Sequence, residues 1–124
     1  GRRDDTDRDL THTALREAEE EIGLNPRSAT VLGQLPYHDT ITNYSITPIV
    51  AIVPSDLTFK PEPGEVEEAF TVPLRHVLTL ANYRIEGRHW RGQKRYYYTV
   101  PYGPYYIWGA TARILRAMAE AVVE

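Results

Sequence analysis

The stretch Thr13-Ala-Leu-Arg-Glu-Ala-Glu-Glu-Glu-Ile-Gly-Leu24 is the most informative part of this 124-residue sequence. At about 100° per residue, helical periodicity gathers three carboxylates in one sector about 100° wide, those of Glu17, Glu20 and Glu21. The apolar side chains of Leu15 and Ile22 fall on the opposite side. Gly23 follows the last periodic residue, where a helix often ends in a left-handed conformation. The pattern therefore predicts an amphipathic helix with an acidic face.

Carboxylates three and four residues apart on a helix repel one another. A hard divalent cation such as Mg²⁺ or Mn²⁺ would offset the repulsion, because such ions prefer oxygen ligands. The alternative is a solvated acidic face in which Arg16 and Glu20 form an ordinary i,i+4 ion pair. The residues alone leave both interpretations open. At the start of the helix, Asp7 or Asp9 is the expected N-cap.

The segment Arg16-Glu-Ala-Glu-Glu-Glu-Ile-Gly-Leu24 resembles the C-terminal half of the Nudix box, R-E-U-x-E-E-x-G-U, where U is aliphatic. In that family, the box binds a divalent cation against the diphosphate of a nucleotide. The resemblance implies that Glu17, Glu20 and Glu21 are the metal ligands, with Mg²⁺ or Mn²⁺ as the cofactor. It also implies a catalytic set of Glu17, Arg16 and Glu20, in which Arg16 orients the acids by ion pairing.

The N-terminal half of the box departs from the common form. Where that form has a glycine and a glutamate, this sequence has Arg2 and Arg8, but one extra loop residue puts Gly1 and Asp7 in their places. This spacing resembles the coenzyme A diphosphatase branch of the Nudix hydrolases, and so does the segment 106–112 (Tyr-Ile-Trp-Gly-Ala-Thr-Ala). We therefore expect strands that normally precede the box to be absent from the 124 residues.

The resemblance implies hydrolysis of coenzyme A or a derivative to 4′-phosphopantetheine and adenosine 3′,5′-bisphosphate. Two alternatives stay open. One is a Nudix pyrophosphatase for ADP-ribose, NADH or dinucleoside polyphosphates. The other is a Nudix-like nucleotide-binding domain without catalysis, which the presence of all three glutamates disfavours.

Composition sets broad limits on the protein. With 124 residues, 42% hydrophobic and 25% charged, we expect one globular domain spanning 1–124. A net charge of −3 gives no reason to expect a nucleic acid partner. The sequence has no cysteine, which suits a cytoplasmic protein, and no apolar run of about 20 residues that would span a membrane. The expected partner is a small nucleotide diphosphate, and a homodimer is one open oligomeric state.

The implied fold class is α/β, a Nudix α/β/α sandwich with a mixed sheet. Local patterns predict strands at 29–35 and 42–53. The β-branched run at the end of the second is typical of a strand buried on both faces, and Pro48 within it indicates a bulge or an edge position. The resemblance to Nudix enzymes implies a further strand after Glu68 and a short helix over about 74–80. A hairpin pairs 85–90 with 96–100, and a core helix runs from Ile107 to Val123.

Two further groups of residues are candidates for substrate binding. Arg2 and Arg3 lie in the loop of the box, where they would meet an anionic substrate. Glu65 and Glu68 lie where many Nudix enzymes place another glutamate, as a metal ligand or general base, and the spacing does not choose between them. The basic residues between 84 and 95 either contact phosphates or balance the acidic helix.

Overall fold

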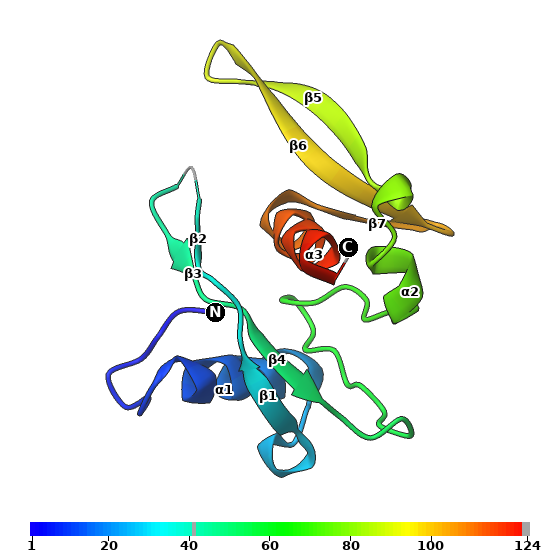
Figure 1. Cartoon of the computed structure of the whole chain (residues 1–124). Coiled ribbons are helices and arrows are strands. Elements are labelled where there is room, and N and C mark those ends of the chain that lie inside the picture. Colours follow the sequence, from blue (N-terminus) through cyan, green and yellow to red (C-terminus); the bar gives the residue numbers. More distant parts are fainter. Residues whose placement is uncertain (41, 123–124) are drawn as a thin grey trace. The chain divides into compact units, whose positions relative to one another are not determined.

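The computed structural model describes residues 1–40 and 42–122, so the predicted end of the last helix at Val123 lies outside the described residues. Contacts divide the chain into two compact units (Figure 1). The first comprises Gly1–Tyr37 and Ser45–Phe70, and the second comprises His38–Tyr44 and Thr71–Glu124. The organisation of 1–124 as a single domain stays a prediction.

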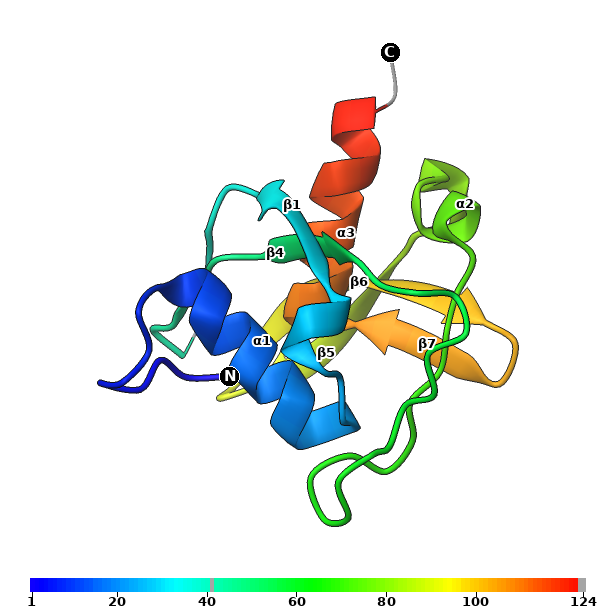
Figure 2. The same cartoon turned by 90° about the horizontal axis from the view of Figure 1, so that it is seen from below.

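The first unit combines one long helix with a two-stranded antiparallel sheet. Its elements are α1 (Leu10–Ile22), η1 (Pro26–Ser28), β1 (Thr30–Gln34), β3 (Ser45–Ile46) and β4 (Ile49–Ile52). β1 pairs with β4, and the register shifts between Val31 and Gly33. Beyond β4, the described residues 53–73 contain no helix or strand, and Figure 2 shows them as a loop with turns.

The segment 42–53 is not one strand buried on both faces, although the irregularity predicted at Pro48 is present. Pro48 separates β3 from β4, because proline has no N–H to donate to a ladder. Its carbonyl accepts from the backbone N–H of Leu35 at 3.0 Å. Within its described sheet, β4 has β1 as its neighbour, and Ile52 at its end is 58% exposed.

The caps of α1 agree with the sequence prediction. Asp9 is the N-cap, and its carboxylate accepts from the backbone N–H of His12 at 2.8 Å. Gly23 ends the helix with φ of +72°. The free carbonyls of the last turn accept from a later loop, Ile22 from Lys60 N–H at 2.7 Å and Glu21 from Glu62 N–H at 2.8 Å. The loop therefore closes the C-terminus of the acidic helix.

Replacing Gly23 with alanine is expected to lower the free energy of unfolding by about 1–2 kcal/mol. The left-handed backbone disfavours a side chain, and the new Cβ would lie 3.2 Å from Cβ of Lys60. Denaturant unfolding measures the loss. Gly64→Ala is the matched control, since Gly64 has φ of +86° with nothing within 4 Å of the added Cβ. Equal losses in both variants would contradict a role for the Lys60 contact.

The second unit is built on a three-stranded antiparallel sheet in the order β5-β6-β7. Its elements are β2 (His38–Asp39), α2 (Leu74–Val77), η2 (Leu80–Asn82), β5 (Arg84–Trp90), β6 (Gln93–Tyr102), β7 (Tyr105–Trp108) and α3 (Gly109–Val122). α3 packs against β6 and β7, and Figure 1 shows the β5–β6 hairpin extending beyond β7. The core contains Val77, Val100 and Ala112, with Tyr98 and Leu115 packed against it.

The predicted hairpin and core helix are confirmed, but their neighbours differ from expectation. Ile107 belongs to β7 instead of the helix, because Tyr105–Trp108 is rich in aromatic and β-branched residues and pairs with β6. Gly109, with φ of +67°, marks the change from strand to helix. The strand expected after Glu68 is absent from the described residues, where Val72 packs into the core without a strand partner.

The α/β class is confirmed, with a difference in the sheet. The β1–β4, β5–β6 and β6–β7 pairs are all antiparallel, so the described residues do not show one mixed sheet. Short turns join β5 to β6 and β6 to β7 and so give antiparallel pairs, whereas a parallel pair needs a longer crossover. Among residues 1–40 and 42–122, no helix is long and apolar enough to cross a membrane.

Candidate metal and catalytic site

Arg16 is the centre of an ion-pair network on α1. Its Nε donates to Asp7 Oδ1 at 3.0 Å, and its Nη1 lies 3.2 Å from Glu17 and 3.3 Å from Glu20. Its Nη2 donates to the carbonyl of Arg2 at 2.8 Å. The guanidinium therefore ties the loop of the box to two of its glutamates.

Asp7 is the buried anchor of this network. Its side chain is 0% exposed, and Oδ2 accepts from Thr13 Oγ1 at 2.9 Å and from the backbone N–H of Asp4 at 2.8 Å. The hydrogen bonds from Arg16 hold the pKa of the Asp7 carboxyl well below its usual value. The same bonds raise the pKa of Arg16. The pair is thus fully ionised near neutral pH.

A second cluster of acids forms around Glu21. Burial raises the pKa of its carboxyl, and a hydrogen bond with Glu17 and the charges of Glu17 and Glu65 raise it further. The loop that caps α1 brings Glu65 into range, since Glu62 N–H donates to the Glu21 carbonyl and Glu65 N–H to the Glu62 carbonyl. The charge of the Gly1 ammonium group lowers the pKa of Glu21 in part, and a bound cation would lower it further.

Gly1 lies directly against the acidic face. A Cβ added at this position would overlap the Glu17 side chain, which would then have to move. The contact agrees with the interpretation that Gly1 takes the place of the glycine of the box.

The predicted metal set is only partly gathered. Glu17 and Glu21 are close enough to share a hydrogen bond, whereas both oxygens of Glu20 accept from Arg16 at 3.3 Å. In the part of the chain that the structure describes, no three His, Asp or Glu side chains stand close enough together to hold an ion. The donor chemistry suits Mg²⁺ or Mn²⁺, since all the oxygens are hard ligands. The three-glutamate set stays a prediction.

The remaining candidates lie in exposed loops. Arg2 contributes its carbonyl to Arg16, while Arg3 is exposed beside it. Glu65 is exposed and close to Glu21, whereas Glu68 is exposed in a segment without regular structure. The structure therefore distinguishes Glu65, which lies near Glu21, from Glu68, whereas the spacing in the sequence did not.

Sequence reasoning missed the contribution of Thr13. Its side chain is buried and donates to Asp7, six residues earlier. A threonine within the first turns of a helix carries no signal for such a contact.

Comparison with known proteins agrees with the resemblance of residues 16–24 to the Nudix box. A family model described as NUDIX domain matches residues 1–94. A protein described as uncharacterized Nudix hydrolase NudL, from Escherichia coli O1:K1 / APEC, is 40% identical over 116 residues, covering 94% of this chain and 60% of that protein. A protein with the same description from Cronobacter sakazakii is 39% identical over 121 residues, covering 98% of this chain and 63% of that protein. The chain thus spans about three fifths of the length of these relatives.

Proposed function

This chain belongs to the Nudix family, and from that premise we propose that it is a metal-dependent pyrophosphohydrolase. Its reaction is the attack of water on a phosphoanhydride bond of a nucleoside diphosphate-linked substrate. The observation that carries the proposal is the acidic face of α1, with Arg16 held by buried Asp7 and touching Glu17 and Glu20.

Glu17, Glu20 and Glu21 would hold Mg²⁺ or Mn²⁺, which neutralises the diphosphate and lowers the pKa of a water when bound. The role of Arg16 is to position two of the glutamates. Because it pairs with Asp7 on one side and with Glu17 and Glu20 on the other, it fixes both glutamates relative to the loop. Arg2 and Arg3 belong to that loop and supply positive charge toward an anionic substrate.

Glu65 is the better candidate for an additional ligand or general base. It contributes to the raised pKa of Glu21, which no interaction of Glu68 is seen to do. A general base must lie within hydrogen-bond reach of the water that it deprotonates, directly or through one other water. The charge of Glu65 acts on Glu21, which supports Glu65 as the glutamate that would reach such a water.

For the substrate, we propose coenzyme A or a derivative, cleaved to 4′-phosphopantetheine and adenosine 3′,5′-bisphosphate. The proposal is supported by the G-x5-D-x8-R-E spacing from Gly1 and by the segment 106–112. ADP-ribose, NADH and dinucleoside polyphosphates are the competing substrates.

Incubation of the chain with Mg²⁺ or Mn²⁺ and either coenzyme A or ADP-ribose tests the proposal, with products identified by mass. Coenzyme A is expected to be cleaved, and Glu20→Gln is expected to reduce the rate by at least about a hundredfold. Glu19→Gln is the matched control, because Glu19 is exposed on the same helix and outside the proposed set.

Each result has a definite meaning. Cleavage of ADP-ribose alone would retain the reaction and reject coenzyme A. Cleavage of neither compound by a protein that still binds Mg²⁺ would reject hydrolysis of both and favour a nucleotide-binding domain. Equal losses in the Glu20 and Glu19 variants would reject the assigned role of Glu20.

A further inference from the structure

The hairpin tip, residues 88–95 of the β5–β6 hairpin, carries a dense positive charge. It contains no acid and four cationic side chains, those of Arg88, Arg91, Lys94 and Arg95, whereas the whole chain has a net charge of −3. All four cationic residues are exposed. Figure 1 shows the hairpin extending beyond β7 within the second unit. The charge therefore lies at a projecting end of the sheet.

The strand register places basic residues opposite one another in the tip. Arg88 pairs with Arg95, and in the next row His89 pairs with Lys94. Successive residues of a strand face opposite sides of a sheet, so these two rows put basic side chains on both faces of the tip. Arg91, in the turn with φ of +48°, adds a charge at the end. Like charges directly opposite on paired strands repel, so an anionic partner on both faces would stabilise the tip.

Acidic residues of the chain do not neutralise this charge by ion pairing. In residues 1–40 and 42–122, the ion pairs are made by Arg16 and Arg116, and none joins a cation of the tip to a carboxylate. Glu86 is the one acid of β5, and it lies opposite Tyr97 in the register. The cations of the tip are therefore available to an external anion.

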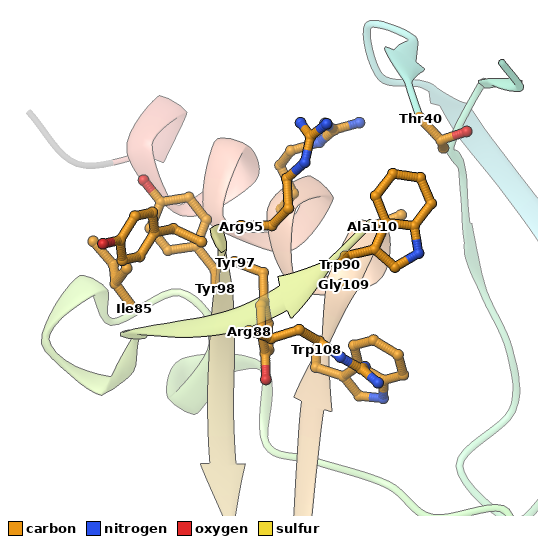
Figure 3. A pocket seen from close by; sticks show the side chains of 12 residues that line it. Thr40, Ile85, Arg88, Trp90, Arg95, Tyr97, Tyr98, Trp108, Gly109 and Ala110 are labelled. Atoms are coloured by element: carbon orange, nitrogen blue, oxygen red, sulfur yellow. The ribbon is translucent and has the colours of Figure 1, made fainter. Parts of the chain in front are cut away.

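Aromatic rings lie among the same cations. The guanidinium carbons of Arg91 and Arg95 lie 4.4 and 5.6 Å from the ring centroid of Trp90. Trp90 also borders a cavity of about 620 Å³ in the second unit, so part of its ring faces open space (Figure 3). Tyr96 is 68% exposed. Tryptophan and tyrosine concentrate at membrane–water interfaces. The tip therefore combines the cationic and aromatic side chains that bind an anionic lipid interface.

We propose that the hairpin tip binds end-on to the headgroup layer of an anionic lipid bilayer. Headgroups can surround a narrow tip, whereas a nucleic acid strand or a protein surface would lie against one face and leave the cations of the other face unpaired. At an anionic surface, each lysine or arginine strengthens binding by about fivefold. Such binding requires neither a metal ion nor hydrolysis, so the inference goes beyond the proposed function and does not rest on it.

Co-sedimentation of the whole chain with lipid vesicles in EDTA tests the proposal. Vesicles of mixed phosphatidylglycerol and phosphatidylcholine are expected to bind at least about tenfold more strongly than vesicles of phosphatidylcholine alone. The binding is expected to be lost when the salt concentration rises from about 0.05 M to about 0.5 M, because salt screens exposed charges. Equal binding to both kinds of vesicle, absence of binding to either, or binding that salt does not weaken would overturn the proposal.

Neutral variants on the two faces of the tip test whether binding is end-on. Arg88→Gln and Lys94→Gln are each expected to weaken binding to the mixed vesicles by about fivefold, because each removes one cation from a different face. Arg75→Gln is the matched control and is expected to bind as the wild type does, since Arg75 is an exposed arginine of α2 outside the tip. Circular dichroism verifies that each variant is folded.

The pattern of losses decides between kinds of partner. Weakening in only one of the two tip variants would indicate a partner that lies against one face, such as a nucleic acid strand, and would overturn the proposal. Equal weakening in all three variants would assign the binding to overall charge and would overturn the tip as its site.

Tryptophan fluorescence locates the contact on the chain. The two tryptophans are Trp90 and Trp108, and Trp108 lies in β7, outside the tip. With saturating mixed vesicles, the emission of the wild type and of Trp108→Phe is expected to shift to shorter wavelength, because the indole of Trp90 leaves water. Trp90→Phe is expected to show no shift. A shift that persists in Trp90→Phe would place the lipid at Trp108 and would overturn the assignment to the tip.

Discussion

Replacement of Asp7 with asparagine is expected to lower the melting temperature by on the order of 10 °C at pH 7. The Asp7 side chain is fully buried, and Arg16 and Thr13 donate to it at 3.0 and 2.9 Å. Asparagine preserves the size but removes the charge and replaces one acceptor oxygen with an NH2 group, so the charge-assisted bonds from Arg16 are weakened and one set of donors loses its acceptor. Thermal unfolding by circular dichroism measures the change. Asp5→Asn, an exposed substitution in the same loop, is expected to have almost no effect.

The pH dependence of this variant tests the cause. Arg16 holds the folded pKa of Asp7 well below the usual 3.8, so below that pH the unfolded chain takes up a proton that the folded chain does not. The stabilisation is therefore present above pH 3.8 and is lost as the pH falls toward the folded pKa. The difference in melting temperature between wild type and Asp7→Asn is expected to narrow in acid. A difference that is constant with pH would show that the charge of Asp7 is not responsible.

Local rules predicted the acidic helix well. Periodicity, the Asp9 cap and Gly23 all act within a few residues, and the structure has α1 at Leu10–Ile22 with these caps. The hairpin was also predictable, because Gly92 lies between two strand-forming runs that pair directly. The boundary at Trp108–Gly109 was not, since apolar helical spacing continues into a strand whose identity depends on pairing with β6.

The site was predictable to the extent that it lies on one helix. The spacing of Glu17, Glu20 and Glu21 puts them on a common face whatever surrounds the helix. Whether Glu65 or Glu68 lies near Glu21 depends on the loop of residues 53–70, whose path no local pattern specifies. The contact between Thr13 and Asp7 likewise depends on how the first loop folds back.

The cavity in the second unit, which residues of β5, β6, β7 and α3 line, could not be predicted from the sequence for a related reason. The sequence shows a basic and aromatic stretch between 84 and 98, but alternate residues of a strand face opposite sides. The register determines that Arg88 lies opposite Arg95, and the packing of α3 brings Arg113 to the same cavity. Both depend on tertiary structure. The sequence alone therefore could not decide whether the basic residues between 84 and 95 contact phosphates or balance the charge of the acidic helix.

Replacement of Glu21 with glutamine is expected to have opposite effects on stability in the absence and presence of metal. Burial, together with Glu17 and Glu65, raises the folded pKa of Glu21 above the usual 4.5. Its contribution is therefore complete below pH 4.5 and is lost as the pH rises through the raised folded pKa, so near pH 7 the ionised group destabilises the fold. In EDTA at that pH, Glu21→Gln is expected to melt about 2–5 °C above the wild type.

Magnesium is expected to reverse this order if Glu21 is a ligand. At a concentration about a hundredfold above Kd, the ion is expected to raise the melting temperature of the wild type by roughly 10 °C and that of Glu21→Gln hardly at all. Glu19→Gln, an exposed change of the same charge on α1, is expected to respond as the wild type does. An undiminished Mg²⁺ response in Glu21→Gln would exclude this carboxylate as a ligand. A variant that is less stable than wild type in EDTA would instead show that Glu21 stabilises the fold, which the crowding of its carboxyl by Glu17 and Glu65 argues against.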